Sequence, residues 1–363
     1  MRRILFLGSL GFILLATGLP GFGQAQDQSC SYTLKEAQQL YQQGLIEKIP
    51  SLLSACMQSG FTRQERQDAY KLILLCYLFD DNQSAADSDM LLFLRKYPEY
   101  EINPTDPKEF VYLFNTYTNP PVFGLGLIGG YTIPQFFVTE SNSTNDLNGT
   151  ARQYKRSGSS YQFGLQINTT LVKQYELGLG IVYSACAFQT VDKISLFSPI
   201  PNETRTYTES QSRIEFPVFV RYNYELTKKI IPYARLGVVP IYMLSATGTV
   251  ARVYTTGTPP DNSPSLDVLK LRNPFGMSLL AGIGVKFRIP RGFIFADLKY
   301  QPGITSQLNS SYVNQQLSSS SSGSTVTKLA WTYGMMLDNF RLNELTVSIG
   351  YAYSFYNPKK KRQ

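Results

Sequence analysis

The charged residues most able to do chemistry lie at alternate positions of strand-like segments in the second half of the chain. Side chains two residues apart on a strand share one face of a sheet, so this spacing collects acids and bases on one face. Two adjacent acids, with Glu215 and Asp297 as candidates, would suit a hydrolase. Paired acids and bases would instead form a stabilising network, because an unpaired buried charge is costly. We predict such a network facing a barrel lumen, made of Glu176, Arg213, Glu215, Arg221, Arg235, Lys286, Asp297 and Lys299.

The sequence contains no histidine. This absence excludes a Ser–His–Asp or Cys–His catalytic site and any metal site with imidazole ligands. The formal net charge is +8; Arg2 and Arg3 contribute two of these charges and the basic run over 359–362 contributes four, or six together. The rest of the chain is only mildly basic, which argues against nucleic-acid binding. We predict no enzyme activity, no cofactor and no bound metal.

The four cysteines show no CxxC spacing, so neither redox catalysis nor a zinc knuckle is indicated. Cys30 and Cys56 flank a predicted helical hairpin, in which the start of the first helix and the end of the second are neighbours. An oxidising periplasm would permit a disulfide there. We predict a Cys30–Cys56 bridge, with Cys76 as a small core residue and Cys186 on a strand.

The segment Leu345–Phe355 alternates bulky apolar residues with small or polar ones. A period of two indicates a β-strand whose two faces meet different environments. An aromatic and aliphatic face opposite a small polar face is typical of a transmembrane β-barrel strand, with lipid outside and the lumen inside. A strand of a soluble sandwich would also alternate, but here the pattern recurs through the second half of the chain.

Short turns near 173, 228 and 290 and long polar segments alternate between the predicted strands, as in outer-membrane barrels. The long segments cover about 134–158, 192–212, 250–273 and 305–340. An even number of strands places the start of the first strand and the end of the last strand on the same, periplasmic side. An eight-stranded barrel is so narrow that side chains fill it, which favours a plugged interior over a channel. We predict eight strands, over 121–131, 159–172, 175–190, 213–226, 230–249, 275–288, 293–304 and 341–356.

The N-terminal part has a different pattern. Two arginines before an apolar run, and small residues near Ala25, predict a secretory signal peptide over 1–25. Residues 26–118 have helical periodicity, with capping boxes predicted at Thr33 with Glu36 and at Thr62 with Glu65. Asp106 is predicted to cap a last helix that starts at Pro107. The helix spacing resembles a degenerate tetratricopeptide repeat unit, too short to form a repeat array.

The C-terminal residues resemble a sequence signal of known proteins. The spacing of Gly350, Tyr353 and Phe355 is similar to the C-terminal assembly signal of outer-membrane barrels, although a basic tail over 358–363 follows it. Together with the glycine-rich and aromatic strands over about 120–360, this ending resembles the PorT-like outer-membrane β-barrel family. The resemblance implies an outer-membrane barrel, and some members are tied to type IX secretion and gliding. The helical extension departs from the bare family pattern.

These patterns predict an α+β multidomain protein: a signal peptide (1–25), a periplasmic tetratricopeptide-like helical domain (26–118), an eight-stranded antiparallel outer-membrane β-barrel (119–357) and a basic periplasmic tail (358–363). The expected function is to anchor a periplasmic interaction module in an envelope or secretion assembly. A small passive pore is the alternative. The expected partners are outer-membrane lipid, the barrel-assembly machinery, and a periplasmic protein or the cell wall through 26–118, without nucleic acid.

Overall fold

A computed structural model describes residues 24–142, 152–172, 174–194, 203–227, 229–254, 260–318 and 323–361. The chain divides into a helical unit, Met1–Thr118 with Pro358–Gln363, and a barrel unit, Asn119–Asn357. Residues 1–23 of the predicted signal peptide lie outside the described residues. Its last two residues, Gln24 and Ala25, belong to the first helix.

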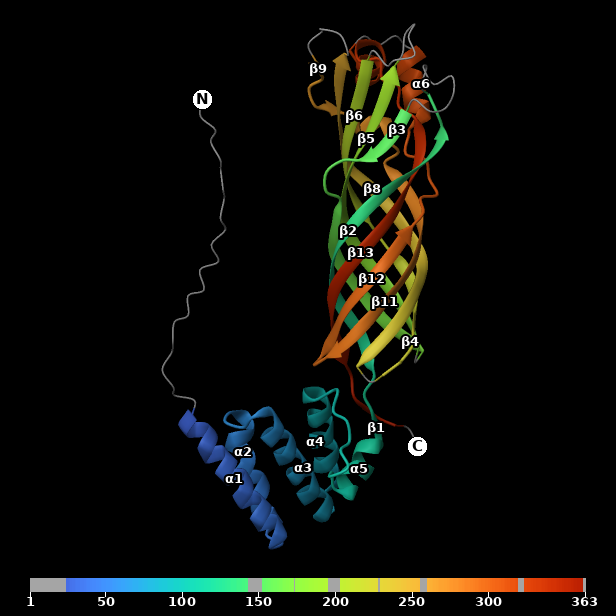
Figure 1. The fold of residues 1–363 in the computed structure, drawn as a ribbon. Helices are drawn as coiled ribbons and strands as arrows, with labels where there is room; N and C mark the ends of the chain where they lie inside the picture. The colour runs from blue at the N-terminus through green and yellow to red at the C-terminus, as the bar shows by residue number, and fades with distance from the viewer. Residues whose placement is uncertain are drawn as a thin grey trace, which may run out of the picture. The chain divides into compact units, whose positions relative to one another are not determined.

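Five α-helices and a short 3-10 helix form the helical unit (Figure 1). They are α1 (Gln24–Gln42), η1 (Ile46–Lys48), α2 (Ile49–Gln58), α3 (Arg63–Phe79), α4 (Gln83–Lys96) and α5 (Lys108–Asn115). The capping box that starts α3 forms as predicted: the Thr62 hydroxyl accepts from the Glu65 N–H, and the Glu65 carboxylate accepts from the Thr62 N–H at 3.0 Å. Gly44, with φ of +78°, follows α1 in a conformation that favours glycine.

Two predicted helix starts are wrong. Thr33 lies inside α1 and donates to the Ser29 carbonyl, so the helix begins well before the proposed capping box. Asp106 does not cap α5, whose N-cap is Pro107. Its carboxylate instead accepts hydrogen bonds from the Tyr100 hydroxyl at 2.7 Å and the Asn103 N–H at 2.8 Å.

The interior of the helical unit is apolar. One cluster of buried side chains joins α1, α2 and α3, and it contains the disulfide between Cys30 and Cys56. A second cluster joins α3, α4 and α5 through edge-on aromatic contacts, with Phe93 and Phe110 at its centre. Cys76 is buried in the first cluster and is not in a disulfide.

The basic tail differs from the solvated run expected at the C-terminus. Lys359–Lys360 form a strand, β14, that pairs antiparallel with β1 (Tyr117–Thr118). The Lys361 N–H donates to the Thr116 carbonyl at 2.8 Å, and the Lys360 ammonium lies 2.5 Å from the Asp87 carboxylate. The tail is therefore part of the helical unit, although more than 200 residues of barrel separate it from that unit in sequence.

Long antiparallel strands form the barrel unit. Consecutive long strands pair with one another, except that β6 and β7 each pair with β5 and β8, and the ring closes where β13 pairs with β2 along nearly their whole lengths. The long strands are β2 (Pro121–Glu140), β4 (Tyr161–Val172), β5 (Tyr175–Ile194), β6 (Glu203–Glu215), β7 (Val218–Asn223), β8 (Ile230–Tyr254), β11 (Phe275–Ile289), β12 (Gly292–Gln301) and β13 (Asn339–Tyr356). Short strands β3 (Arg152–Arg156), β9 (Asp261–Asn262) and β10 (Leu266–Asp267) add to the ring.

The turns near 173, 228 and 290 mark one end of the barrel, which we call the turn end. The opposite end, the loop end, carries β3, β9 and the helices α6 (Ser310–Ser318), α7 (Thr325–Thr327) and η3 (Lys328–Thr332) (Figure 1). A short 3-10 helix, η2 (Leu269–Leu271), precedes β11. Several segments expected to be loops extend the wall at this end: β2 continues to Glu140, and the pairing of β6 with β8 starts at Glu203.

One predicted strand, over 213–226, is divided between β6 and β7. Pro217 lies in the break and has no N–H to donate to a sheet, which interrupts the pairing. Its carbonyl still accepts from the Gly180 N–H of β5 at 2.9 Å. Both β6 and β7 pair with β5 on one side and β8 on the other, so together they fill one position in the ring.

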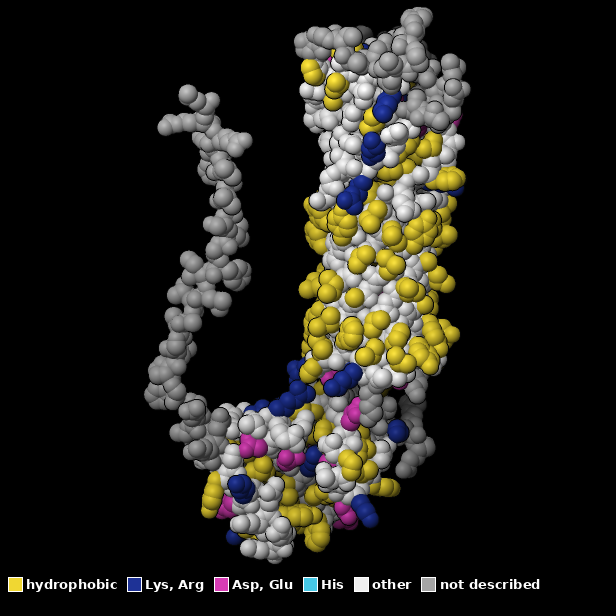
Figure 2. All heavy atoms as spheres, in the orientation of Figure 1, with side chains coloured by type: hydrophobic (Ala, Val, Ile, Leu, Met, Phe, Trp, Pro, Cys, Tyr) yellow, Lys and Arg dark blue, Asp and Glu magenta, His cyan; other side chains and the backbone are white. Residues whose placement is uncertain are grey.

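The outer face of the barrel changes character along its length. Towards the turn end it carries large apolar side chains, each more than half exposed, such as Leu127, Leu236, Ile283, Val347 and Ile349. Figure 2 shows them as a broad hydrophobic band on the visible face. On β6, near the loop end, the corresponding outward positions carry only hydroxyl side chains: Thr204, Thr206, Thr208, Ser210 and Ser212. An apolar band suits lipid, and a hydroxyl face suits water. Among the described residues, no helix is long and apolar enough to cross a membrane.

Candidate functional site: the charged interior of the barrel

A triad of charged side chains lies inside the turn end of the barrel. The Glu176 carboxylate on β5 accepts from Lys286 on β11 at 2.7 Å and from Arg221 on β7 at 3.0 Å. The guanidinium of Arg221 also lies 4.6 Å from the centre of the Tyr233 ring, within the range of a cation–π contact. One acid thus holds two cations that come from strands on either side of β8.

A second group lies on neighbouring positions of β8, β11 and β12. Asp297 accepts from Arg235 and from the Tyr233 hydroxyl, each at 2.8 Å. Arg235 and Tyr233 are on β8 and Asp297 is on β12, so both must reach across β11. Gly284 of β11 makes this possible, because a Cβ there would lie 2.6 Å from the Tyr233 ring. The glycine therefore opens the route for the long side chains of β8.

Two further pairs cross the lumen beside this group. Arg213 on β6 forms an ion pair with Glu344 on β13, and both side chains are almost wholly buried. Lys299 on β12 lies 3.8 Å from Glu215 and donates to the Gln162 carboxamide at 2.9 Å. All eight residues predicted to face the lumen therefore lie inside the barrel and have an oppositely charged partner.

The charged interior continues into the loop end. The Glu209 carboxylate is held by Arg272 in a two-point contact of 2.5 and 2.9 Å and by the Tyr207 hydroxyl at 2.6 Å. Arg152 contacts Asp192 and Asp338 at 2.6 Å each. Paired contacts of this kind fix orientation as well as charge.

Glu203, the last acid of the interior towards the loop end, forms ion pairs with two cations. Arg205 and Arg252 each lie 2.7 Å from its carboxylate. Burial alone would raise the pKa of Glu203, but the two guanidiniums outweigh burial and hold the pKa below its ordinary value. The carboxylate therefore stays ionised at neutral pH and keeps both cations in place.

Several members of the network were missed by sequence reasoning. Glu344 shares the inward face of β13 with Thr346 and Ser348, so extending the alternation one step before Leu345 would have found it. Glu209 and Glu203 lie an even number of residues before Glu215 on β6 and so share its inward face, but they fall in a segment expected to be a loop. Arg272 lies outside the strands, after η2, and no periodicity points to it.

The chemistry open to this interior is limited by its pairing. Glu215 and Asp297, the candidates for a two-acid site, have different cationic partners, and the described residues show no hydrogen bond between them. Some buried polar atoms lack a protein partner, including Arg221 Nη2, Gln166 Nε2 and Gln301 Oε1. Atoms of this kind are usually satisfied by ordered water. Within the described residues, no cluster of Cys, Asp and Glu side chains could hold a metal ion.

The residues of the predicted assembly signal have packing roles near the end of β13. A Cβ on Gly350 would lie 2.2 Å from the Phe295 ring, so only glycine fits beneath that ring. Phe355 stacks on Phe123 of β2 with ring centres 4.4 Å apart, and Tyr353 contacts Phe355 edge-on. These contacts lie at the seam where the first and last long strands close the barrel.

A closed antiparallel barrel with an apolar outer band and a charged interior defines the class of outer-membrane β-barrels. The chain belongs to the outer membrane protein beta-barrel domain family, whose model matches residues 119–309. This match confirms the family-level expectation and implies an outer-membrane location.

Comparison with curated proteins gives no match. Among solved structures, OprG from Pseudomonas aeruginosa is similar over 65% of this chain and 97% of its own, with 13% identity and a TM-score of 0.32. The outer membrane protein AlkL, in DMPC lipid bilayers, is similar over 71% of this chain and 97% of its own, with 9% identity and a TM-score of 0.31. Neisserial surface protein A covers 64% and 97%, with 8% identity and a TM-score of 0.30. These values are too low to support an inference about function.

Proposed function

We propose that this protein is an eight-stranded, non-conducting outer-membrane barrel that anchors a tetratricopeptide-like helical unit in the periplasm, where the unit docks a protein partner or the cell wall. In this proposal β6 and β7 count as one interrupted strand. The barrel has a structural role and no enzymatic one. A PorT-like role in an envelope or secretion assembly is consistent with this architecture.

The observation that carries the proposal is the filled interior. Charged layers follow one another from Glu176 near the turn end, through Asp297 and Glu344, to Glu209 and Glu203 near the loop end. Each acid is engaged by a cation, and small barrels are filled by their side chains. A solute would have to displace several buried ion pairs to pass, and each is costly to break.

The surface of the helical unit supports the docking part of the proposal. Tyr112, Phe79 and Tyr32 are 76%, 75% and 71% exposed, on α5, α3 and α1 respectively. Exposed aromatic side chains are enriched where proteins bind one another. Figure 2 shows hydrophobic side chains on the visible surface of this unit. A helical unit without such side chains would be expected to act only as a spacer.

The alternative is a small passive pore. The buried polar atoms without a protein partner, such as Arg221 Nη2 and Gln301 Oε1, favour some water inside the barrel. Single-channel recording from the purified full chain in planar bilayers separates the two functions, with a known porin as a positive control. We expect no conductance steps, and discrete steps would establish the pore.

Docking is tested by mild-detergent purification of the full chain from native outer membranes, followed by mass spectrometry. The variant Phe79→Ser with Tyr112→Ser changes only exposed side chains of the helical unit. Trp331→Ser, in the barrel unit, is the matched control, because Trp331 is 79% exposed. We expect a stoichiometric partner that is lost in the helical variant and kept in the control. A partner retained by both variants, or none in wild type, would contradict docking through these side chains.

A further inference from the structure

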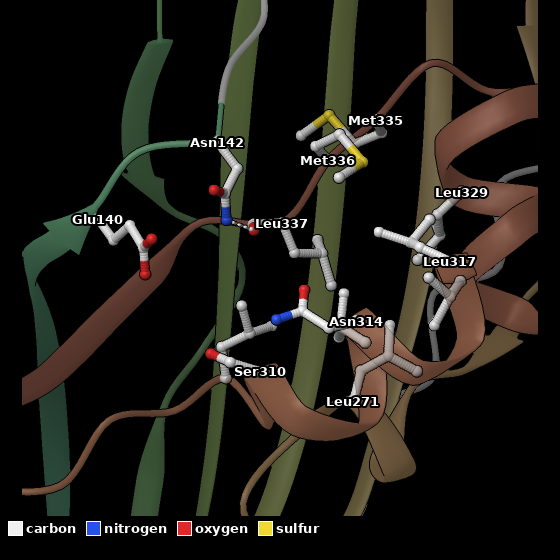
Figure 3. A pocket seen from close by; sticks show the side chains of 13 residues that line it. Glu140, Asn142, Leu271, Ser310, Asn314, Leu317, Leu329, Met335, Met336 and Leu337 are labelled. Atoms are coloured by element: carbon white, nitrogen blue, oxygen red, sulfur yellow. Dashed lines mark hydrogen bonds between the residues drawn. The ribbon is translucent and has the colours of Figure 1, made fainter. Parts of the chain in front are cut away.

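A cavity of about 100 Å³ lies at the loop end of the barrel, beside the charged interior: Arg152 donates to the Met336 carbonyl at 2.9 Å, and the Asn142 N–H donates to Asp338 at 2.7 Å. Its walls come from α6, from α7 with η3, from η2, and from the segment that leads into β13 (Figure 3). Most of the lining is aliphatic or thioether, with Leu271, Leu317, Leu329, Met335, Met336 and Leu337 as its main members. The site is built from well-buried residues, because Met335 is only 1% exposed and Leu271 and Leu329 are 2% exposed.

An apolar cavity of this size is suited to a small apolar group. Cavities lined by Leu, Ile and Phe stay dry, and one of about 150 Å³ takes up benzene. By that measure a void of about 100 Å³ would hold roughly four carbon atoms, so the remaining carbons of a six-carbon chain would lie towards the polar side of the cavity. Two adjacent methionines contribute to one wall, and methionine adapts its shape to different partners more readily than branched side chains do.

One side of the cavity is polar. Ser310 and Asn314 of α6 line it, together with Asn142 and Glu140 from the end of β2 and the residues after it. Asn142 is already engaged, since its carboxamide donates to the Leu337 carbonyl at 2.9 Å. Asn314 is exposed and lies at the solvent-facing side of the cavity, with no hydrogen-bond partner for its carboxamide among the described residues, and Figure 3 shows this group between α6 and Leu337.

The charge at the cavity determines which polar group a bound molecule can carry. Glu140 is the charged residue in the lining, and its carboxylate would repel an anion such as a fatty acid. A free carboxamide can both donate and accept, which suits a hydroxyl group. An uncharged molecule with an apolar body and one hydroxyl therefore matches both the aliphatic wall and Asn314.

We propose that this cavity binds a small neutral amphiphile, an alcohol with about six carbon atoms, with its apolar part against Met335, Met336 and Leu329 and its hydroxyl on Asn314. The inference goes beyond the proposed docking function and does not depend on it. It concerns a cavity at the loop end of the barrel unit, beside the charged interior.

The test uses 1-hexanol and the full chain in uncharged phosphatidylcholine nanodiscs, with ¹³C-labelled methionine methyl groups observed by NMR. Met335 and Met336 report on the cavity. Met90, which is buried in the helical unit, and Met277, which is 43% exposed on the outer face of the barrel, are internal controls. We expect saturable shifts at Met335 and Met336 alone, and hexanoate should cause at least several-fold smaller shifts. Linear shifts at Met277 as well would indicate partitioning into lipid and overturn the proposal.

Two variants sharpen the test. Val313→Phe places extra volume in the cavity and should abolish saturation, with the Met90 and Met277 signals unchanged as evidence of folding. Asn314→Leu keeps the volume but removes the hydrogen bond, so hexanol should bind about 3- to 10-fold more weakly. Equal binding by Asn314→Leu would overturn the assignment of the hydroxyl to Asn314. Absence of any shift at Met335 and Met336 in wild type up to the solubility of hexanol would overturn the site.

Discussion

The helical unit and the barrel unit have opposite interiors. The helical unit buries aliphatic and aromatic side chains, such as Leu53, Phe93 and Phe110, and turns polar groups to its surface. The barrel exposes its apolar side chains in a band and buries arginine and glutamate, with Arg213 and Arg221 among its most buried residues. The medium outside explains the inversion: water favours an apolar interior, and lipid favours an apolar exterior.

This difference predicts which substitutions destabilise each unit. In the helical unit, stability rests mainly on apolar burial and a disulfide. Its ion pair Lys360–Asp87 is partly exposed, although the Lys71–Asp106 pair is largely buried. In the barrel, pairs such as Arg235 with Asp297 are buried from bulk solvent, with side chains only 3% and 0% exposed, so bulk water cannot readily replace a lost partner. Removing one charge should therefore be costly in the barrel, whereas removing an exposed charge of the helical unit, such as that of Lys360, should cost little.

The largest effect is expected for Asp297→Leu. It leaves Arg235 buried without its acid, and breaking a buried pair costs about 3–5 kcal/mol. The double variant Asp297→Leu with Arg235→Met should recover most of this loss, since a matched apolar pair replaces the ions. Guanidinium unfolding of the refolded barrel, followed by circular dichroism, measures both. Equal destabilisation by the single and double variants would show that the ion pair itself is not what the barrel requires.

The second effect is expected for Cys30→Ala with Cys56→Ala. The bridge joins residues 26 apart in sequence, and a loop of that length stabilises the folded state by about 3.5 kcal/mol in the chain-entropy description. Hydrogen–deuterium exchange should rise across α1 and α2 and stay unchanged in the barrel. Cys76→Ala is the matched control, because it removes a buried sulfur without opening a bridge. A barrel that also loosened would contradict the independence of the two interiors.

A smaller effect is expected when the chain ends at Asn357. This truncation removes β14, its pairing with β1 and the contact between Lys360 and Asp87. Half of the Lys360 side chain is exposed, so the ion pair itself contributes little. The lost backbone hydrogen bonds should destabilise the helical unit by about 1–2 kcal/mol. A chain ending at Lys361 is the control. Exchange at α5 that is the same in both truncations would show that the strand pair is not stabilising.

The barrel could be predicted from the sequence where its outer face meets lipid. There, strands such as β8 and β13 alternate between apolar and polar residues, and the alternation reveals both the strand and its inward charges. On β6 the outward residues become Thr and Ser, so the contrast in hydrophobicity disappears although the pairing continues to Glu203. Glu203 and Glu209 were missed for this reason, since their neighbours no longer mark a buried face.

Other features depend on contacts distant in sequence. The pairing of Thr118 with Lys359 joins residues on opposite sides of the barrel sequence, and a basic run at a chain end normally indicates a solvated segment. Asp106 before Pro107 is a typical helix cap, but its carboxylate contacts Lys71 at 2.9 Å instead. Tertiary ion pairing outweighs local capping at that position. Local patterns could not predict either contact, because each depends on a partner from another element.

The smallest expected effect concerns Glu65, whose pKa is lowered by hydrogen bonds from Ser31 and Thr62. A carboxyl with a lowered pKa in the folded state stabilises that state above its unfolded pKa, about 4.5. This contribution is lost as the pH falls through the folded pKa. Glu65→Gln keeps the capping geometry without the charge, so it should cost less than about 1 kcal/mol at pH 6. At pH 3 it should cost almost nothing. Denaturation followed at 222 nm at both pH values measures this, and a cost that grew towards pH 3 would contradict the sign.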